Sequence, residues 1–275
     1  MNDLLRELAP VSAGAWREIE DEAKRTLRLM LAARKLVDFT GPLGWETSAV
    51  KHGRNTSLQS GEPGVELRLR TVQPLLEVRV QFELAREELE AVARGAKDAN
   101  LDPVREAARK AAIVEDRAVF HGHAEAGIFG IAEAAKAHTL TLTDDYTAYP
   151  AVVAEAIHNL HSAGIAGPYG IALGPRCYTG LTKTTKGGFP VIEHVRKLVE
   201  GPIVWAPAVN GAAVLSQRGD DFELIVGQDF SIGYLDHSES AVWLYLQESF
   251  TFRVLSPEAA IPLAYPADTP RPTRA

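Results

Sequence analysis

The sequence predicts an α+β fold, in which long helices accompany several groups of strands. Residues 12–38 and 102–120 carry apolar side chains at the three-to-four spacing of an amphipathic helix. Residues 65–84 instead alternate apolar and polar side chains, which is the period of a strand. Residues 139–216 alternate helical and strand patterns, and residues 212–263 consist of strand patterns separated by turns.

The composition is that of an ordinary globular protein with a large core, since 46% of the 275 residues are hydrophobic and 24% are charged. The net charge of −7 argues against a general nucleic-acid binder, whose surface is normally basic. No apolar run approaches the roughly 20 residues that cross a bilayer, and Met1 does not open a secretory signal. We therefore expect a cytoplasmic protein that begins at or near Met1, with no membrane or nucleic-acid partner.

The first predicted helix begins at Ser12, which can cap its N-terminus, and ends before Gly41 and Pro42. Its apolar face comprises Trp16, Ile19, Ala23, Leu27, Met30 and Leu31. The next segment, residues 41–50 (GPLGWETSAV), is rich in glycine, aromatic and small polar residues. A second segment of this kind lies at residues 227–234 (GQDFSIGY). Neither supplies a nucleophile with a base, a metal cluster or a phosphate loop, so both are interpreted as architectural.

A long two-armed β element is predicted next. Residues 50–64 are polar with a turn at 61–64, and the alternating run of residues 65–84 is interrupted at Pro74. Long strand edges are normally paired or covered. The arm has little to rest on within one chain, so it indicates a contact between subunits.

The second long helix has Asp102 as its predicted N-cap and Pro103 at its first position, and its alanine-rich body runs to about Phe120. The later strand patterns predict an antiparallel meander over residues 212–263, with Phe230, Ile232 and Tyr234 on one face. The proline-rich C-terminus lacks periodicity and is expected to be mobile.

Several residues could carry chemistry, but the structural interpretation of each is stronger. His121 and His123 are two apart and do not share a helix face, and His158 and His161 lack further ligands. The single cysteine, Cys177, lacks the signature of a nucleophile and is expected to pack in the core. We predict no catalytic residue and no metal site.

Two other patterns are also weak when taken alone. The loop at residues 180–188 has the composition of a phosphate loop in the wrong order, although its lysines could attract anions. Arg34 and Asp38 are four apart, which predicts an exposed ion pair that contributes about 0.3 to 0.5 kcal/mol.

Taken in order, the motifs identify a family that the chain resembles. They are LLRELAP (4–10), ARKLVD (33–38), GPLGWETSAV (41–50), ARG (93–95), VEDRAVFHG (114–122), GPY (167–169), GGFPVIEHV (187–195), IVWAPAV (203–209), RGDDFELIVGQDFSIGY (218–234) and LYLQESFTF (244–252). Over residues 4–263 the chain resembles the family 1 encapsulins, shell proteins once described as linocin-type bacteriocins.

The resemblance implies an HK97-type capsid fold with a peripheral domain, an axial domain and an extended loop. The expected units are an N-terminal inner helix (1–40), an extended intersubunit loop (41–85), a peripheral domain with a spine helix (86–138 and 217–263), an axial domain (139–216) and a mobile tail (264–275). An inner helix in the first unit distinguishes an encapsulin from a phage major capsid protein.

The resemblance also implies a function. Such subunits form an icosahedral homo-oligomer, in its smallest form of about sixty subunits, which encloses a cargo protein that bears a C-terminal targeting peptide. The cargo in relatives is a dye-decolourising peroxidase or a ferritin-like iron oxidase, which connects the shell with oxidative stress or iron storage. Carried over by position, the peptide-binding residues are Leu31, Arg34, Asp38, Phe230 and Ile232.

A pore loop is implied at the fivefold axis by residues Lys183, Lys186, Gly187, Gly188 and Phe189, where a ring of lysines would favour anions. Some relatives bind flavin against a tryptophan, but the matching position here is Glu87, so no cofactor is expected. A peptidase, a flavin-dependent redox enzyme and a phage capsid protein are the alternative hypotheses.

Overall fold

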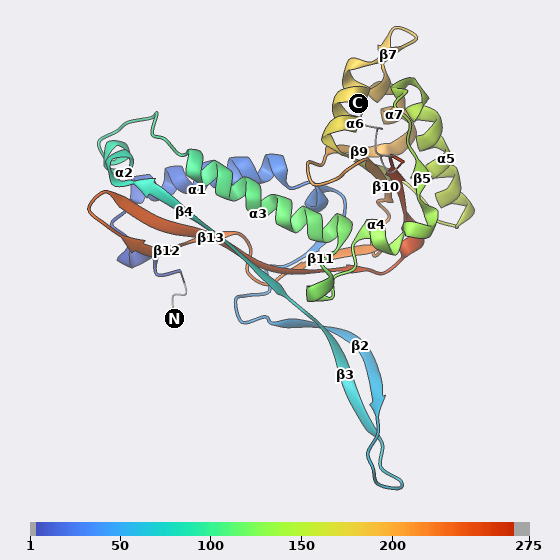
Figure 1. Cartoon of the computed structure of the whole chain (residues 1–275), viewed down its shortest axis with the longest axis horizontal. Coiled ribbons are helices and arrows are strands. Elements are labelled where there is room, and N and C mark those ends of the chain that lie inside the picture. The colour runs from blue at the N-terminus through green and yellow to red at the C-terminus, as the bar shows by residue number, and fades with distance from the viewer. Residues whose placement is uncertain (1–3, 267–275) are drawn as a thin grey trace, which may run out of the picture.

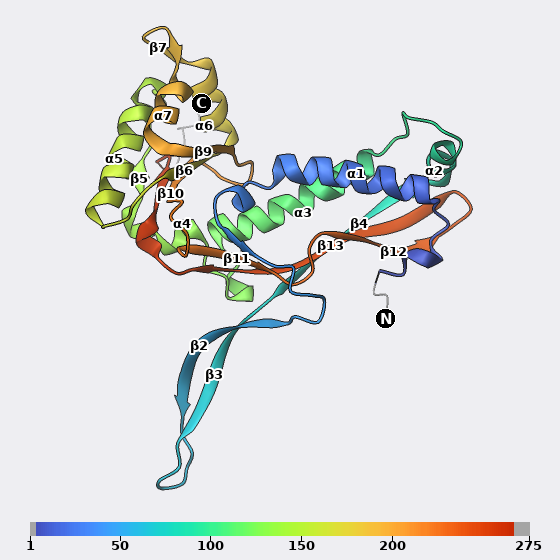
Figure 2. The same cartoon turned by 180° about the vertical axis from the view of Figure 1, so that it is seen from behind.

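The computed structural model describes residues 4–266. Figures 1 and 2 show an elongated body of two long helices on a twisted sheet, a second α/β unit at one end of the body, and a two-stranded arm that projects from it. Within residues 4–266, no helix is long and apolar enough to cross a membrane.

The sheet of the body is built around the long strand β13 (Ala241–Val254). Along one side of β13, β11 (Phe222–Val226) and β12 (Ser231–His237) pair with successive parts of it in antiparallel fashion. On the other side lies β4 (Leu76–Ala85), also antiparallel. The short strand β1 (Asp38–Thr40) extends the sheet by pairing in parallel with β11.

The helices α1 (Ala13–Met30) and α3 (Asp102–His121) lie over one face of this sheet, with the short α2 (Arg86–Ala93) beyond them (Figures 1 and 2). As predicted, the Ser12 hydroxyl caps α1 by accepting a hydrogen bond from the Ala15 amide at 3.2 Å. The apolar face of α1 packs in one buried cluster with α3, β4, β12 and β13. Asp102 was predicted as the N-cap of α3 but is its first residue, since the cap position is Leu101.

The first helix is shorter than the sequence pattern predicted, because α1 ends at Met30 rather than near residue 38. Leu31 is extended, and a short 3-10 turn, Ala33–Lys35, leads into β1. The cause is a tertiary contact: the Asp116 carboxylate on α3 accepts hydrogen bonds from the backbone amides of Ala32 and Ala33, each at 2.9 Å. A buried acceptor that satisfies these amides allows the chain to turn away from the helical path.

The projecting arm is a hairpin of β2 (Ala49–Leu58) and β3 (Leu67–Pro74), which pair in antiparallel fashion. Sequence reasoning missed β2, because its outer residues are exposed on both faces and show no alternation. The predicted two-armed element is therefore divided: β3 belongs to the arm, whereas β4 lies in the sheet of the body.

The second unit contains a mixed sheet in the order β5 (Leu140–Thr141), β14 (Ala260–Ala264), β10 (Ala212–Ser216), β6 (Tyr169–Leu173) and β9 (Glu200–Trp205). Its helices and smaller elements are α4 (Ile131–Ala134), α5 (Tyr149–Ser162), α6 (Pro175–Lys183), α7 (Val191–Val199), β7 (Thr185–Lys186) and β8 (Phe189–Pro190).

The prediction of one meander over residues 212–263 was wrong, since β10 and β14 join this second sheet and only β11, β12 and β13 stay in the first. Strand periodicity identifies a strand but not its partner. The alternating helices and strands predicted over residues 139–216 otherwise agree with the structure. Of the tail predicted to be mobile, residues 267–275 lie outside the described part of the chain.

Candidate functional site

A groove of about 410 Å³ lies where the C-terminal half of α1 meets the start of β12. Its apolar lining consists of Leu27, Leu31 and Phe230. The other residues that line it are charged: Lys24, Arg28, Arg34, Lys35 and Asp229. Lys24, Leu27 and Arg28 follow the three-to-four spacing of one face of α1, and Leu31 follows directly after the helix ends, which is why one segment supplies both kinds of lining.

Arg34 joins the groove to the interior of the body. Its Nε donates to Glu115 Oε2 at 2.9 Å, its Nη1 to Asp229 Oδ1 at 2.8 Å, and its Nη2 to both Glu115 and Glu248. The Arg34 side chain is 17% exposed, whereas those of Glu115 and Glu248 are 0% exposed. The Phe230 ring also lies 5.0 Å from the guanidinium carbon. This network connects α3, β13 and the start of β12 through one side chain.

The protonation of this network follows from its burial. Burial opposes the positive charge of Arg34, but the hydrogen bond and the charge of Glu115, with those of Glu248 and Asp229, raise its pKa above the usual value. Burial also raises the pKa of Glu248 well above its usual value, and the adjacent Glu115 carboxylate adds to this effect, while Arg34 opposes it. A carboxyl group with a raised pKa holds its proton to higher pH, so Glu248 adds less negative charge to the buried centre than an exposed glutamate would.

Asp116 stabilises the turn that carries Arg34 through its hydrogen bonds with the amides of Ala32 and Ala33. Burial raises the pKa of Asp116 to about 7, against the opposing effect of the hydrogen bonds from Ala33 and Ala32. Glu115 and Asp116 are neighbours on α3, so one turn of α3 fixes both the Arg34 side chain and the backbone before it.

The two glycine-rich segments interpreted as architectural lie against each other. The Leu43 amide donates to the Val226 carbonyl at 2.9 Å, and the Gly44 amide donates to the Gly227 carbonyl at 2.8 Å. Gly41 has φ of +138°, and a Cβ there would lie 2.4 Å from the Val226 oxygen. Only glycine permits this approach. The contact fixes the chain immediately before Asp229 and Phe230.

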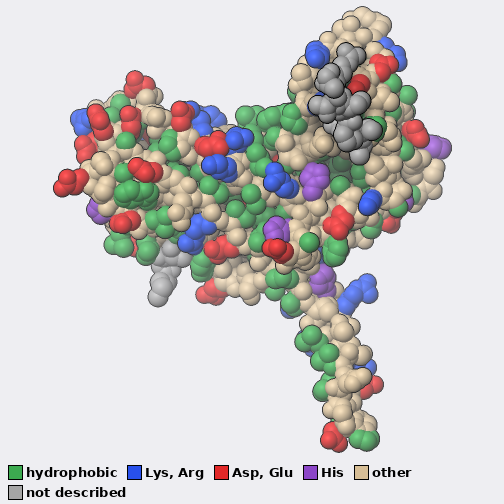
Figure 3. All heavy atoms as spheres, viewed as in Figure 1, with side chains coloured by type: hydrophobic (Ala, Val, Ile, Leu, Met, Phe, Trp, Pro, Cys, Tyr) green, Lys and Arg blue, Asp and Glu red, His purple; other side chains and the backbone are tan. Residues whose placement is uncertain are grey.

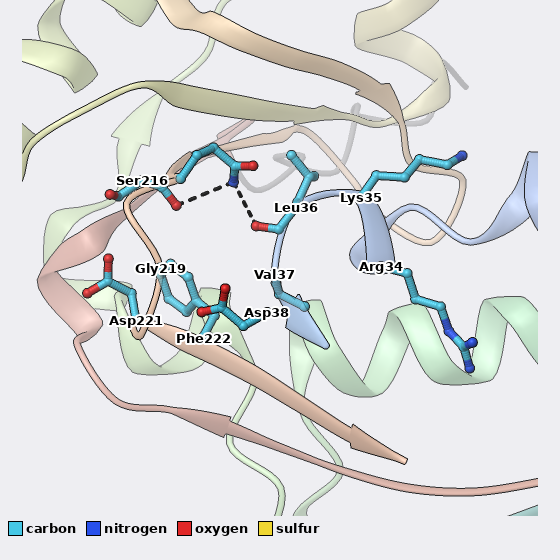
Figure 4. A pocket seen from close by; sticks show the side chains of 10 residues that line it. Arg34, Lys35, Leu36, Val37, Asp38, Ser216, Gly219, Asp221 and Phe222 are labelled. Atoms are coloured by element: carbon cyan, nitrogen blue, oxygen red, sulfur yellow. Dashed lines mark hydrogen bonds between the residues drawn. The ribbon is translucent and has the colours of Figure 1, made fainter. Parts of the chain in front are cut away.

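The structure brings three of the five expected peptide-binding residues together, since Leu31, Arg34 and Phe230 all line the groove. Ile232 does not line it, because its side chain is 5% exposed and packs in the core cluster. Asp38 lines a separate cavity of about 120 Å³, together with residues 34–37 and the turn around Gly219. In Figure 4 the Arg34 side chain points away from Asp38.

The predicted ion pair between Arg34 and Asp38 was therefore wrong. The spacing of four residues brings side chains together only on a continuous helix, and the helix ends before both. Asp38 instead accepts a hydrogen bond from the Asp220 amide at 2.7 Å, next to the strand that pairs with β1.

Sequence reasoning missed the groove cations Lys24, Arg28 and Lys35 and the carboxylates that hold Arg34. A usable signal was present for Glu115 and Asp116. These two acidic residues interrupt the alanine-rich stretch of α3 on its buried side, where an acid needs a partner. The sequence could not predict which residue is that partner, since Glu115 and Arg34 are 81 residues apart.

The loop expected at the pore is a hairpin of β7 and β8 that forms the tip of the second unit (Figure 1). Gly187 and Gly188 occupy its turn with φ of +60° and +86°. The Lys186 ammonium donates to the Thr147 carbonyl at 2.9 Å, so within one subunit it is drawn toward the loop before α5. Phe189 is the exposed apolar side chain of the hairpin, at 65% exposure.

The other residues considered for catalysis, metal binding or flavin binding lie outside the groove. Cys177 is buried as predicted, with the hydroxyls of Tyr149 and Tyr265 each 3.3 Å from its sulfur. The His121 Nε2 lies 3.1 Å from the Ala208 carbonyl, and no group of three or more metal-ligating side chains occurs within residues 4–266. Glu87 lies exposed in the first turn of α2, and the expectation of no flavin stays a prediction.

The fold is the HK97-like capsid fold. The chain is similar to the virus-like particle of Pyrococcus furiosus, with a TM-score of 0.63, 17% identity and coverage of 90% of this chain and 98% of the other. It is also similar to the chain described as Mycobacterium phage Bobi, with a TM-score of 0.54, 15% identity and coverage of 87% and 91%. These likenesses confirm the predicted fold.

Sequence comparison identifies the family. The family model described as "Encapsulating protein for peroxidase" matches residues 1–251. A type 1 encapsulin shell protein of Rhodospirillum rubrum is 58% identical over 96% of each chain, and one of Mycobacterium tuberculosis is 44% identical over 96% of this chain and 100% of the other. The chain therefore belongs to the encapsulin shell proteins. The predicted structural, non-enzymatic role is confirmed by these relatives.

Proposed function

We propose that this shell subunit encloses a guest protein by binding a short C-terminal segment of that guest in the groove between α1 and β12. The subunit would form a closed icosahedral particle in the cytoplasm, in its smallest form of about sixty copies. The particle would contain the guest, and the subunit itself would supply no catalytic group.

The observation that carries this proposal is the groove itself. Leu27, Leu31 and Phe230 form an apolar lining beside exposed charges, which suits an extended segment with apolar side chains. Burying such side chains contributes about 25 cal/mol per Å². Many copies of one groove in a closed particle would also bind an oligomeric guest with high avidity.

The family description favours a peroxidase as guest, since the matching model is named for encapsulating one. A ferritin-like iron oxidase is the second candidate. A peroxidase guest would give the particle a role in oxidative stress, and an iron oxidase would give it one in iron storage. We propose that small molecules reach either guest through openings at the β7–β8 hairpins, where Phe189 and the backbone of the two turn glycines would line the passage.

The test is guest loading with a groove variant. The protein that co-purifies with native particles is identified, and its C-terminal segment is fused to a monomeric fluorescent protein, so that avidity does not mask the change at one site. Phe230→Ala removes apolar contact worth about 1 to 2 kcal/mol, which lowers affinity roughly five- to thirtyfold. The ratio of fluorescent guest to shell protein in purified particles should fall accordingly.

Leu29→Ala is the matched control, because Leu29 is an exposed apolar residue of α1 that does not line the groove. Both variants should form particles of normal size, and only Phe230→Ala should lose the guest. Equal loading of the two variants would show that the guest binds elsewhere.

A further inference from the structure

The charge that remains available around the groove is positive. All three guanidinium nitrogens of Arg34 already donate to carboxylates of Glu115, Asp229 and Glu248. Arg34 is therefore poorly suited to bind a charge on a guest. The exposed cations that line the groove are Lys24, Arg28 and Lys35.

These three cations differ in how far they are neutralised. Lys24 lies 4.0 Å from the Glu20 carboxylate. Lys35 donates only to the Leu29 carbonyl, at 3.4 Å, and within residues 4–266 neither Lys35 nor Arg28 forms a salt bridge with an acid. Arg28 and Lys35 thus lie beside the apolar lining without an acid at salt-bridge distance among the described residues, although the charge of Lys35 acts on the buried Asp116 and lowers its pKa.

Asp229 is the acid that lines the groove and could attract a cation instead. Its Oδ1 accepts hydrogen bonds from Arg34 and from the Phe230 amide, each at 2.8 to 2.9 Å. The carboxylates of Glu115, Glu248 and Asp229 raise the pKa of Arg34 against the opposing effect of burial, so the ionised guanidinium offsets part of the Asp229 charge. Because this one carboxylate is already engaged, the exposed cations Arg28 and Lys35 determine the sign of charge that the groove prefers.

Resting on the proposed function, we infer that Arg28 and Lys35 bind a carboxylate of the guest segment while its apolar side chains occupy the lining formed by Leu27, Leu31 and Phe230. The carboxylate comes from the chain terminus or from an Asp or Glu side chain. Each cation contributes up to about fivefold in affinity, which is typical of exposed ion pairs, and added salt weakens the contribution.

The experiment selects guests from a library. A monomeric fluorescent protein carries random C-terminal tags, and half of the library continues past the tag with a Gly-Ser extension that moves the terminal carboxylate away. The library is co-expressed with the wild-type chain, with Arg28→Glu/Lys35→Glu, with Arg17→Glu as an exposed charge-reversal control on the same helix, and with Phe230→Ala. Tags that co-purify with particles are sequenced.

Wild-type and Arg17→Glu particles should select apolar tags that present a carboxylate. If the terminus supplies it, unextended tags load several-fold better; if a side chain supplies it, Asp or Glu is enriched in both halves of the library. Arg28→Glu/Lys35→Glu should reverse the preference toward Lys and Arg. The inference is overturned if wild-type particles select basic tags and load extended and unextended tags equally. It is also overturned if Arg28→Glu/Lys35→Glu particles keep the wild-type preference. Full loading of Phe230→Ala would instead overturn the proposed function.

Discussion

Replacing Arg34 with alanine should destabilise the subunit rather than only weaken guest binding. The substitution leaves Glu115 and Glu248, both 0% exposed, without the cation that they share. Removing one partner of a buried ion pair costs about 3 to 5 kcal/mol, because the remaining charge has no compensation. For a chain of this size, that corresponds to a fall of roughly 6 to 20 °C in melting temperature.

Asp229→Asn is the control, because it removes the carboxylate of the network that is 43% exposed. An exposed pair contributes about 1 kcal/mol or less. The assay is the apparent melting temperature of the purified particle by scanning fluorimetry, with particle yield measured alongside. A fall for Arg34→Ala no larger than that for Asp229→Asn would refute the argument that Arg34 holds the buried glutamates.

Three further predictions follow from the contacts around the groove. Burial raises the folded-state pKa of Asp116 from 3.8 to about 7, so its contribution to stability is complete below about pH 4 and is lost as the pH rises through 7. The melting temperature of Asp116→Asn should therefore decline less over this pH range than that of the wild type. Equal declines would contradict a raised pKa at Asp116. Gly41→Ala should cost about 1 to 3 kcal/mol, because its Cβ would meet the Val226 carbonyl oxygen, and an unchanged melting temperature would exclude that contact. Ser12→Ala should cost about 1 kcal/mol through loss of the helix cap, whereas no loss would indicate that the cap is dispensable.

Much of the fold was predictable because its elements carry local signals. The helix α3 has alanine-rich periodicity and a proline in its first turn, and β4 alternates apolar and polar residues along its length. The assignment of strands to sheets was not predictable in this way. β10 and β11 have similar local patterns but join different sheets, since their partners are set by contacts distant in sequence.

Residues of the groove were predictable only where their position in a family motif was enough to identify them. Leu31 and Phe230 were identified by position in the family motifs, and both line the groove. Asp38 was expected beside these residues but lines a separate cavity, because its location depends on where α1 ends, and Asp116 on a different helix sets that end. The cations of the groove lie on an exposed helix face, where sequence alone does not distinguish a binding residue from a solvated one.

Electron microscopy of the purified particle tests whether this shell subunit receives a guest in its groove. We expect closed, hollow icosahedral particles, with the groove lined by Leu31 and Phe230 facing the interior and filled by additional density when guest is present. Monodisperse monomers or dimers at physiological salt, or closed particles with this groove on the outer surface, would contradict it.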